Sequence, residues 1–265
     1  MKSPQAGRRA IASVAASFAL CLAAAVAHAQ QPARTGDSAP PATNPVSPES
    51  IKALQDMGAY LQTLTRFRAT AEVTGERVLA DGQKLQHTAS ATVDVARPNR
   101  LRVRMISPRS ERELVFDGRT VTLFTPALKY YSTVEFADTV GGLVGRLQER
   151  FGVDVPLSDL LVWGTPAAPL DRIQSGMNAG QDFVGQDLCD HYAFRQGDVD
   201  WQIWIMTGSR PLPRKIVITD RKDEARPQSV TLIGWNTKPA FDAATFAFVP
   251  PKGATKVEMV PLKSR

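Results

Sequence analysis

Apolar and charged side chains alternate along residues 97–125, and this alternation predicts antiparallel strands that share one apolar face. Within residues 100–105 the arginines fall on one face, and the other face carries Leu101, Val103 and Met105. A period of two residues is typical of a strand that is buried on one side and hydrated on the other. The stretch therefore predicts a sheet whose apolar face is built to hold something apolar.

The following strand fits this pattern if residues 107–110 make the turn. Leu101 then lies opposite Phe116, and Val103 lies opposite Leu114. Facing residues that agree in chemistry stabilise a sheet and fix its register. We therefore expect both strands to present their apolar side chains to the same side.

An Asp-Gly pair at residues 117–118 predicts the next hairpin, because Asp-Gly favours the tight turns that join antiparallel strands. The strand after it adds Val121 and Leu123 to the apolar face. The same face thus extends over at least three strands.

A second Asp-Gly pair, at residues 81–82, separates two longer strands expected at residues 67–80 and 83–96. With this pair as the turn, Glu76 lies opposite His87. We therefore expect His87 to be a surface ion-pair partner and not a ligand.

The C-terminal half returns to strands, with a hairpin turn at residues 197–198. This turn sets Phe194 opposite Trp201 and Tyr192 opposite Ile203, which makes the apolar face dense in aromatic side chains. Further strands are expected at residues 128–134, 212–220 and 228–236, with a last segment that holds Phe246 and Phe248. The expected total is nine or ten strands.

A helix is expected to open the folded part of the chain, with Ser47 as its N-cap and Pro48 in its first turn. Its apolar face comprises Ile51, Leu54, Met57 or Gly58, Leu61 and Leu64. This spacing of three and four residues is that of an amphipathic helix packed on a core.

The apolar period changes to that of a helix between Asp138 and Gly152. One face is formed by Val140, Leu143, Val144, Leu147 and Phe151. Glycines at positions 141, 142 and 145 each cost about 1 kcal/mol relative to alanine in a helix interior, so this helix depends on packing for its shape. Two interpretations stay open: an ordinary amphipathic surface helix, or a lid that opens at low cost. A second short helix, residues 156–163, adds apolar cover through Leu157, Leu160, Leu161 and Trp163.

These elements predict an α+β fold, in which a curved antiparallel sheet, a half-open β-barrel, wraps helices and carries a helical lid insertion. We expect a single domain over residues 48–262, since about 215 residues suit one domain.

The first residues indicate export. Lys2, Arg8 and Arg9 precede an uncharged run, and residues 27–29 read Ala-His-Ala, which is typical of a signal-peptidase site. We expect a secretory signal peptide at residues 1–29, cleaved after Ala29, and a flexible leader at residues 30–47 that is rich in proline, alanine, serine and threonine. The predicted location is the periplasm.

Charge and cysteine content exclude two further classes of protein. Removal of three cations and no anions lowers the formal net charge from +6 to +3, which is too mild for a nucleic-acid-binding protein. Only Cys189 remains after cleavage, so no intrachain disulfide framework is possible, and we expect this thiol to be buried.

Motifs for catalysis are absent from the sequence. It contains no Gly-x-Ser-x-Gly elbow, phosphate-binding loop, zinc-ligand spacing or His-Glu-x-x-His motif. Asp190 and His191 are adjacent on a strand and therefore point to opposite faces, so they do not form an acid–base pair. We expect no enzyme activity, no metal and no cofactor.

Several motifs together resemble those of the LolA-like periplasmic carriers of lipidated proteins. They are Arg-Pro-Asn at 97–99, Ser-Pro at 107–108, Asp-Gly at 117–118 followed by Phe124 and Pro126, and the closing stretch at 240–253. The whole looks closest to predicted periplasmic proteins of unknown function in that superfamily. The resemblance implies a half-open barrel with a helical lid over an apolar cavity for acyl chains, and it gives Arg97 the part of a lid latch. Residues 138–196 depart from the pattern.

The candidate site follows from the face assignments and the resemblance together. The expected apolar cavity is lined by Leu101, Val103, Met105, Leu114, Phe116, Val121, Leu123, Tyr130, Tyr192, Phe194, Trp201 and Ile203. The expected lid comprises Val140, Leu143, Val144, Leu147, Phe151, Leu160, Leu161 and Trp163, with Arg97 as its latch.

The expected function is that of a periplasmic carrier or binding protein for lipids or the acyl chains of lipidated proteins. The alternative is an envelope sensor or adaptor that binds lipidated protein and signals to a membrane partner. Partners in the inner or outer membrane fit either function, and we expect a monomer.

Overall fold

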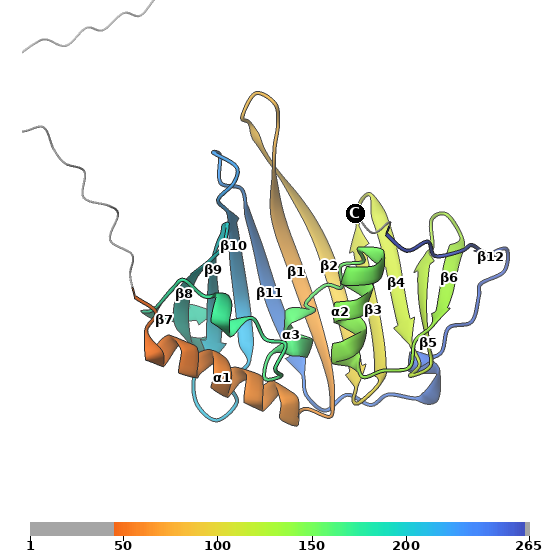
Figure 1. The fold of residues 1–265 in the computed structure, drawn as a ribbon, viewed down its shortest axis with the longest axis horizontal. Helices are drawn as coiled ribbons and strands as arrows, with labels where there is room; N and C mark the ends of the chain where they lie inside the picture. The colour runs from red at the N-terminus through yellow and green to blue at the C-terminus, as the bar shows by residue number, and fades with distance from the viewer. Residues whose placement is uncertain (1–44, 263–265) are drawn as a thin grey trace, which may run out of the picture. The chain divides into compact units, whose positions relative to one another are not determined.

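The computed structural model describes residues 45–262, which lie in one compact unit. Its main feature is a single sheet of twelve strands in the order β12-β6-β5-β4-β3-β2-β1-β11-β10-β9-β8-β7 (Figure 1). The predicted signal peptide, and the leader up to residue 44, lie outside the described residues.

The helices and strands follow one another with short connections. The helices are α1 (Pro48–Thr63), α2 (Val140–Phe151) and α3 (Asp159–Val162), with 3-10 turns η1 (Leu170–Arg172) and η2 (Ala243–Phe246). The first six strands are β1 (Arg66–Val78), β2 (Lys84–Ala96), β3 (Arg100–Ser107), β4 (Ser110–Phe116), β5 (Thr120–Thr125) and β6 (Tyr130–Glu135). The others are β7 (Ser175–Val184), β8 (Asp187–Gln196), β9 (Val199–Met206), β10 (Pro213–Asp220), β11 (Gln228–Asn236) and β12 (Thr255–Lys256).

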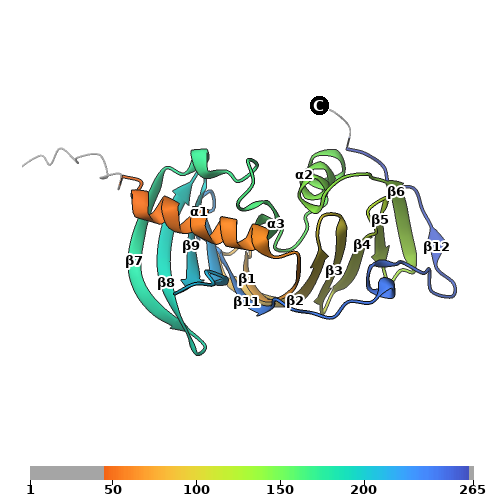
Figure 2. The same cartoon turned by 90° about the horizontal axis from the view of Figure 1, so that it is seen from below.

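The sheet is open, curved and almost wholly antiparallel, and its concave face holds the helices. Helix α1 runs along the open side of β7, β8 and β9 toward β1, while α2 stands in front of β3 (Figures 1 and 2). Among the described strands β12 alone pairs in parallel, with β6, and an isolated parallel bridge joins Val46 to Gly176. The predicted α+β half-barrel with helices on its inner face is confirmed.

The predicted registers of two hairpins are confirmed. Strands β3 and β4 pair Leu101 with Phe116, and the turn closes at residues 107–110. Strands β8 and β9 pair Phe194 with Trp201. Register was readable here because each strand alternates strictly, so that a shift of one residue would turn its apolar side chains outward.

The predicted register of the β1–β2 hairpin was wrong by one residue. His87 pairs with Gly75, and Glu76 instead forms an ion pair with Lys84 at 3.1 Å. The connection is longer than a two-residue turn, because the Leu79 N–H donates to the Gln83 carbonyl. His87 is therefore not the partner of Glu76.

Three strand assignments also differ from the prediction, and one of them is the short strand β12, which was not expected. Strand β7 was not expected, because its residues are mostly small or polar and lie exposed at the edge of the sheet. The last predicted strand is instead the 3-10 turn η2, which ends at Phe246 and is capped by the Asp242 side chain. Short polar edges and isolated aromatic residues carry no period from which a strand can be predicted.

Helix α1 begins as predicted, and the other helices begin later than expected. The Ser50 N–H donates to the Ser47 hydroxyl at 3.4 Å, with Pro48 in the first turn. In α2 the N-cap is Thr139 and not Asp138, and Gly152 ends the helix in the left-handed region at φ 64°. Helix α3 is shorter than predicted because Leu157 adopts φ 57°, which interrupts the helix.

The main core lies between the concave face and the helices, and a small cluster lies on the convex face. This second cluster contains Cys189, Trp204 and Val217. Cys189 is wholly buried as predicted, and desolvation raises the pKa of its thiol to about 11. No helix in the described part of the chain is long and apolar enough to cross a bilayer.

Candidate functional site

The concave face brings together most of the residues predicted to line a cavity. Eight of the twelve are buried in one apolar cluster: Leu101, Val103, Leu114, Phe116, Val121, Tyr192, Phe194 and Ile203. Leu123 and Trp201 are partly buried against the same cluster. Met105 and Tyr130 are exposed, by 37% and 48%, toward the outer edge of that face.

The predicted lid residues belong to the same cluster. Seven are buried in it, namely Val140, Leu143, Val144, Leu147, Leu160, Leu161 and Trp163, while Phe151 is half-buried against it. The apolar face that the sheet offers is therefore covered by residues 139–173, here named the cover segment. In this conformation the cover fills much of the space that the sequence predicted to be a cavity.

An apolar pocket of about 350 Å³ remains beside the cover segment. It lies between strands β3 to β5 and residues 152–156. Its sheet side includes Val103, Met105, Leu114 and Leu123, four of the predicted cavity residues, together with Arg112, which pairs with Met105 across β3 and β4. This volume lies within the range of about 300–1,000 Å³ that is usual for small-molecule sites.

A second, smaller pocket of about 200 Å³ lies at the other end of the cover segment. Residues of α3 face strands β9 and β10 across it, with Trp163 on the cover and Trp201 on the sheet. The two indole rings are 6.1 Å apart between centroids. Cover and sheet thus meet through aromatic contact here.

Helix α1 holds one end of the cover segment. The Gln62 Nε2 donates to the Trp163 carbonyl at 2.6 Å. Immediately beyond, Gly58 packs against Gly164 so closely that a Cβ on Gly58 would lie 2.5 Å from the Gly164 nitrogen. A glycine in α1 is what allows this approach.

Helix α2 is tied at both ends by backbone hydrogen bonds. The Val140 N–H donates to the Pro98 carbonyl at 2.8 Å, and the Leu262 N–H donates to the Arg150 carbonyl at 2.9 Å. Between these ends the helix is held chiefly by its apolar face. Such a cover can detach without breaking a ladder of sheet hydrogen bonds.

Arg97, the predicted latch, lies beside the first of these ties. Its Nε and Nη2 are buried without a hydrogen-bond partner among the described residues, and burial lowers the pKa of its guanidinium. The bond to α2 comes from the adjoining Pro98 carbonyl. A latch through the Arg97 side chain therefore stays a prediction.

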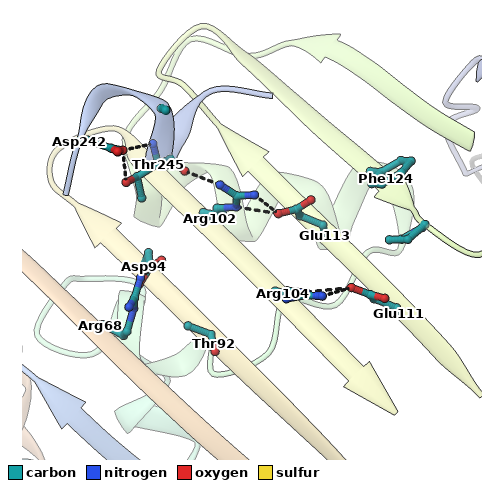
Figure 3. Close-up of a pocket in the computed structure, with 12 residues that line it drawn as sticks. Arg68, Thr92, Asp94, Arg102, Arg104, Glu111, Glu113, Phe124, Asp242 and Thr245 are labelled. Carbon is teal, nitrogen blue, oxygen red and sulfur yellow. Dashed lines mark hydrogen bonds and ion pairs between the residues drawn. The ribbon is translucent and has the colours of Figure 1, made fainter. Parts of the chain in front are cut away.

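The convex face carries a polar groove that the sequence analysis did not identify (Figure 3). Its volume is about 720 Å³, and ion pairs cross its floor: Arg68 with Asp94, Arg102 with Glu113 and Arg104 with Glu111. The alternating arginines of β3 were the signal that could have indicated it. The three arginines are thus paired, and the fourth carboxylate of the lining, Asp242, accepts hydrogen bonds from the Thr245 N–H and hydroxyl.

Within the described residues, the polar side chains considered for catalysis do not come together. They hold no group of three or more residues that could bind a metal ion. His191 lies on the convex face, where it stacks on Trp204 with 4.0 Å between ring centroids and contacts Gln202. Asp190 instead accepts a hydrogen bond from Gln181.

The fold is an open half-barrel whose apolar face is covered, and its family is shown by sequence. The chain belongs to the family described as "Predicted periplasmic protein (DUF2092)", whose model matches residues 50–260. This description agrees with the predicted periplasmic location. No curated protein matches the chain in sequence.

Solved structures with a similar layout are distant in sequence. An uncharacterized conserved protein from Thermus thermophilus is 14% identical with a TM-score of 0.47, over 78% of this chain and 99% of that one. LprF from Mycobacterium bovis is 12% identical with a TM-score of 0.43, over 80% and 100%. A LolA superfamily protein from Nitrosomonas europaea is 10% identical with a TM-score of 0.36, over 75% and 97%.

Proposed function

We propose that this protein binds the acyl chains of lipids or of lipidated proteins between the concave face of its sheet and the cover segment. The observation that carries the proposal is the shared apolar cluster: sheet and cover bury the same set of aliphatic and aromatic side chains against each other. An acyl chain offers the same chemistry and can take the place of the cover. The 350 Å³ pocket beside residues 152–156 is where it would enter.

The free energy of burying an acyl chain favours a binding site that opens and closes. A buried methylene contributes about 0.8 kcal/mol, so a 16-carbon chain contributes roughly 12 kcal/mol before any costs. A ligand held that strongly in a rigid pocket would leave slowly. A cover whose own apolar contacts replace those of the ligand lowers the net gain and permits exchange.

The cover segment has the features that such an exchange requires. It is attached through apolar packing, the Gln62 bond to the Trp163 carbonyl and the two backbone ties of α2. Two of the α2 glycines, Gly141 and Gly145, have no close neighbour that demands a glycine, so they weaken the helix without a packing role.

Binding of a fluorescent fatty-acid probe tests the proposal, with two neighbouring residues of β3 as a matched pair. Met105 lines the pocket and Ile106 lies on the opposite face, and the two are exposed to nearly the same extent, 37% and 39%. Met105→Glu places a charge in the pocket and should weaken binding at least tenfold, whereas Ile106→Glu should leave it unchanged. Equal affinities in the two variants would refute the proposed site.

A further inference from the structure

The 200 Å³ pocket at the α3 end of the cover segment contains an unpaired carboxylate among aromatic and aliphatic walls. Its walls include Trp163 from the cover, Trp201 from β9, and Ile216 and Ile218 from β10. Asp159, at the start of α3, is the one charged residue of the lining. Asp159 is exposed to solvent, so its carboxylate can be reached from outside the chain.

The two indoles form the aromatic side of this pocket. Their planes are inclined by 49°, and Trp201 is itself held by stacking on Phe194, with 4.3 Å between ring centroids. Trp163 is 7% exposed, and its backbone carbonyl accepts the hydrogen bond from Gln62. The aromatic faces are therefore preorganised.

Asp159 has no ion-pair or hydrogen-bond partner for its carboxylate within residues 45–262. Asp159 is exposed to solvent, and partial desolvation by the surrounding atoms raises the pKa of its carboxyl group. Arg172 lines an adjoining cavity of about 650 Å³ that also reaches Asp159, but it forms no ion pair with it. The carboxylate is thus available to a ligand from outside the chain.

A cavity of about 650 Å³, lined by residues of the cover segment and not by the sheet, adjoins both pockets. Residues 153–155 line both the 350 Å³ pocket and the 650 Å³ cavity, and Asp159 lines both the 650 Å³ cavity and the 200 Å³ pocket. A volume of 200 Å³ is below the usual size of a whole-ligand site, so it suits a head group. The apolar pocket suits the chain that the head group carries.

We propose that the Asp159 pocket binds the positively charged amine head of an amphiphile whose alkyl chain lies against the concave face. Aromatic faces attract a cation through their quadrupole, and a carboxylate beside them adds a charge-assisted contact. The same carboxylate repels anionic head groups. This inference rests on the proposed function and adds the class of head group to it.

Alkyl chains of equal length with different heads test the inference. The probes are dodecyltrimethylammonium, dodecanol and dodecanoate, titrated below their micelle concentrations and followed through tryptophan fluorescence, since Trp163 and Trp201 line the pocket. The unmodified protein should bind the ammonium probe most tightly and dodecanoate least. Asp159→Asn should weaken binding of the ammonium probe about tenfold and leave dodecanol unchanged, and Asp159→Glu should retain most of the preference.

Asp171→Asn is the matched control, because Asp171 lines the adjoining cavity and not the Asp159 pocket. It should leave all three affinities unchanged. Equal binding of the three probes, or equal losses in the Asp159→Asn and Asp171→Asn variants, would overturn the head-group inference while the acyl-chain site stands. If neither dodecanol nor the fatty-acid probe binds, the proposed function itself fails.

Discussion

The contact between α1 and the cover segment offers a way to open the cover by a substitution that is not itself in a pocket lining. In the change Gly58→Ala, the new Cβ would lie 2.5 Å from the Gly164 nitrogen, 2.9 Å from the Gly164 Cα and 3.1 Å from the Trp163 carbonyl carbon. All three are backbone atoms, so no side chain can turn aside. The segment must move away from α1.

Overpacking of this kind costs about 1–3 kcal/mol, which corresponds to about a 5- to 150-fold rise in the fraction of molecules with an open cover. Alanine also favours helix α1 by about 1 kcal/mol. That gain is present whether the cover is open or closed, so it cancels from the opening equilibrium.

Stopped-flow release of a fluorescent fatty-acid probe measures the effect, and Gly58→Ala should accelerate release at least fivefold. Amide hydrogen exchange in residues 159–164 should accelerate with it. Ala59→Gly is the control, since Ala59 is exposed in the same helix and the change alters helix propensity in the opposite sense without a new contact. Unchanged release and unchanged exchange in Gly58→Ala would refute the assignment of residues 139–173 as a mobile cover.

Three further predictions concern stability and reactivity. Gly145→Ala should raise the free energy of unfolding of α2 by about 1 kcal/mol in hydrogen exchange, because no atom lies near the new methyl, whereas Gly142→Ala should not, because its Cβ meets the Asp138 carboxylate. Cys189 should react with a thiol reagent only after denaturation, since it is buried and its pKa is about 11; rapid labelling of the folded protein would contradict its position. The raised pKa of Asp159 means that the folded state binds the proton more tightly than the unfolded state, so the free energy of unfolding falls as pH rises above about 4. Asp159→Asn should therefore be more stable than the unmodified protein at pH 7 in thermal melts. The difference should vanish below about pH 4.

Strict alternation made much of the sheet readable from the sequence. Leu101 and Val103 had to face Phe116 and Leu114, because any other register would have exposed one strand or buried arginines. The polar edge strand β7 could not be read in this way, since its residues have no buried face to impose a period. The β1–β2 register failed because one Asp-Gly pair does not fix the length of a turn.

The sequence predicted which residues form the apolar face of the candidate site. It did not predict how far the cover segment fills the space in front of that face. Periodicity identified the residues that share the apolar face, and the structure gathers most of them in one cluster. That the cover packs into this face, and that α1 holds it through Gly58 and Gln62, depends on contacts between residues about one hundred positions apart. Asp159 likewise acquires its aromatic neighbours only in three dimensions.

Native mass spectrometry of the protein purified from a cell-envelope extract tests the central claim most directly. The account predicts that the unmodified protein and Ile106→Glu carry an acylated species that is lost from Met105→Glu. The absence of any acylated species from the unmodified protein, or its equal retention in Met105→Glu, would contradict an acyl-chain site between the sheet and its cover.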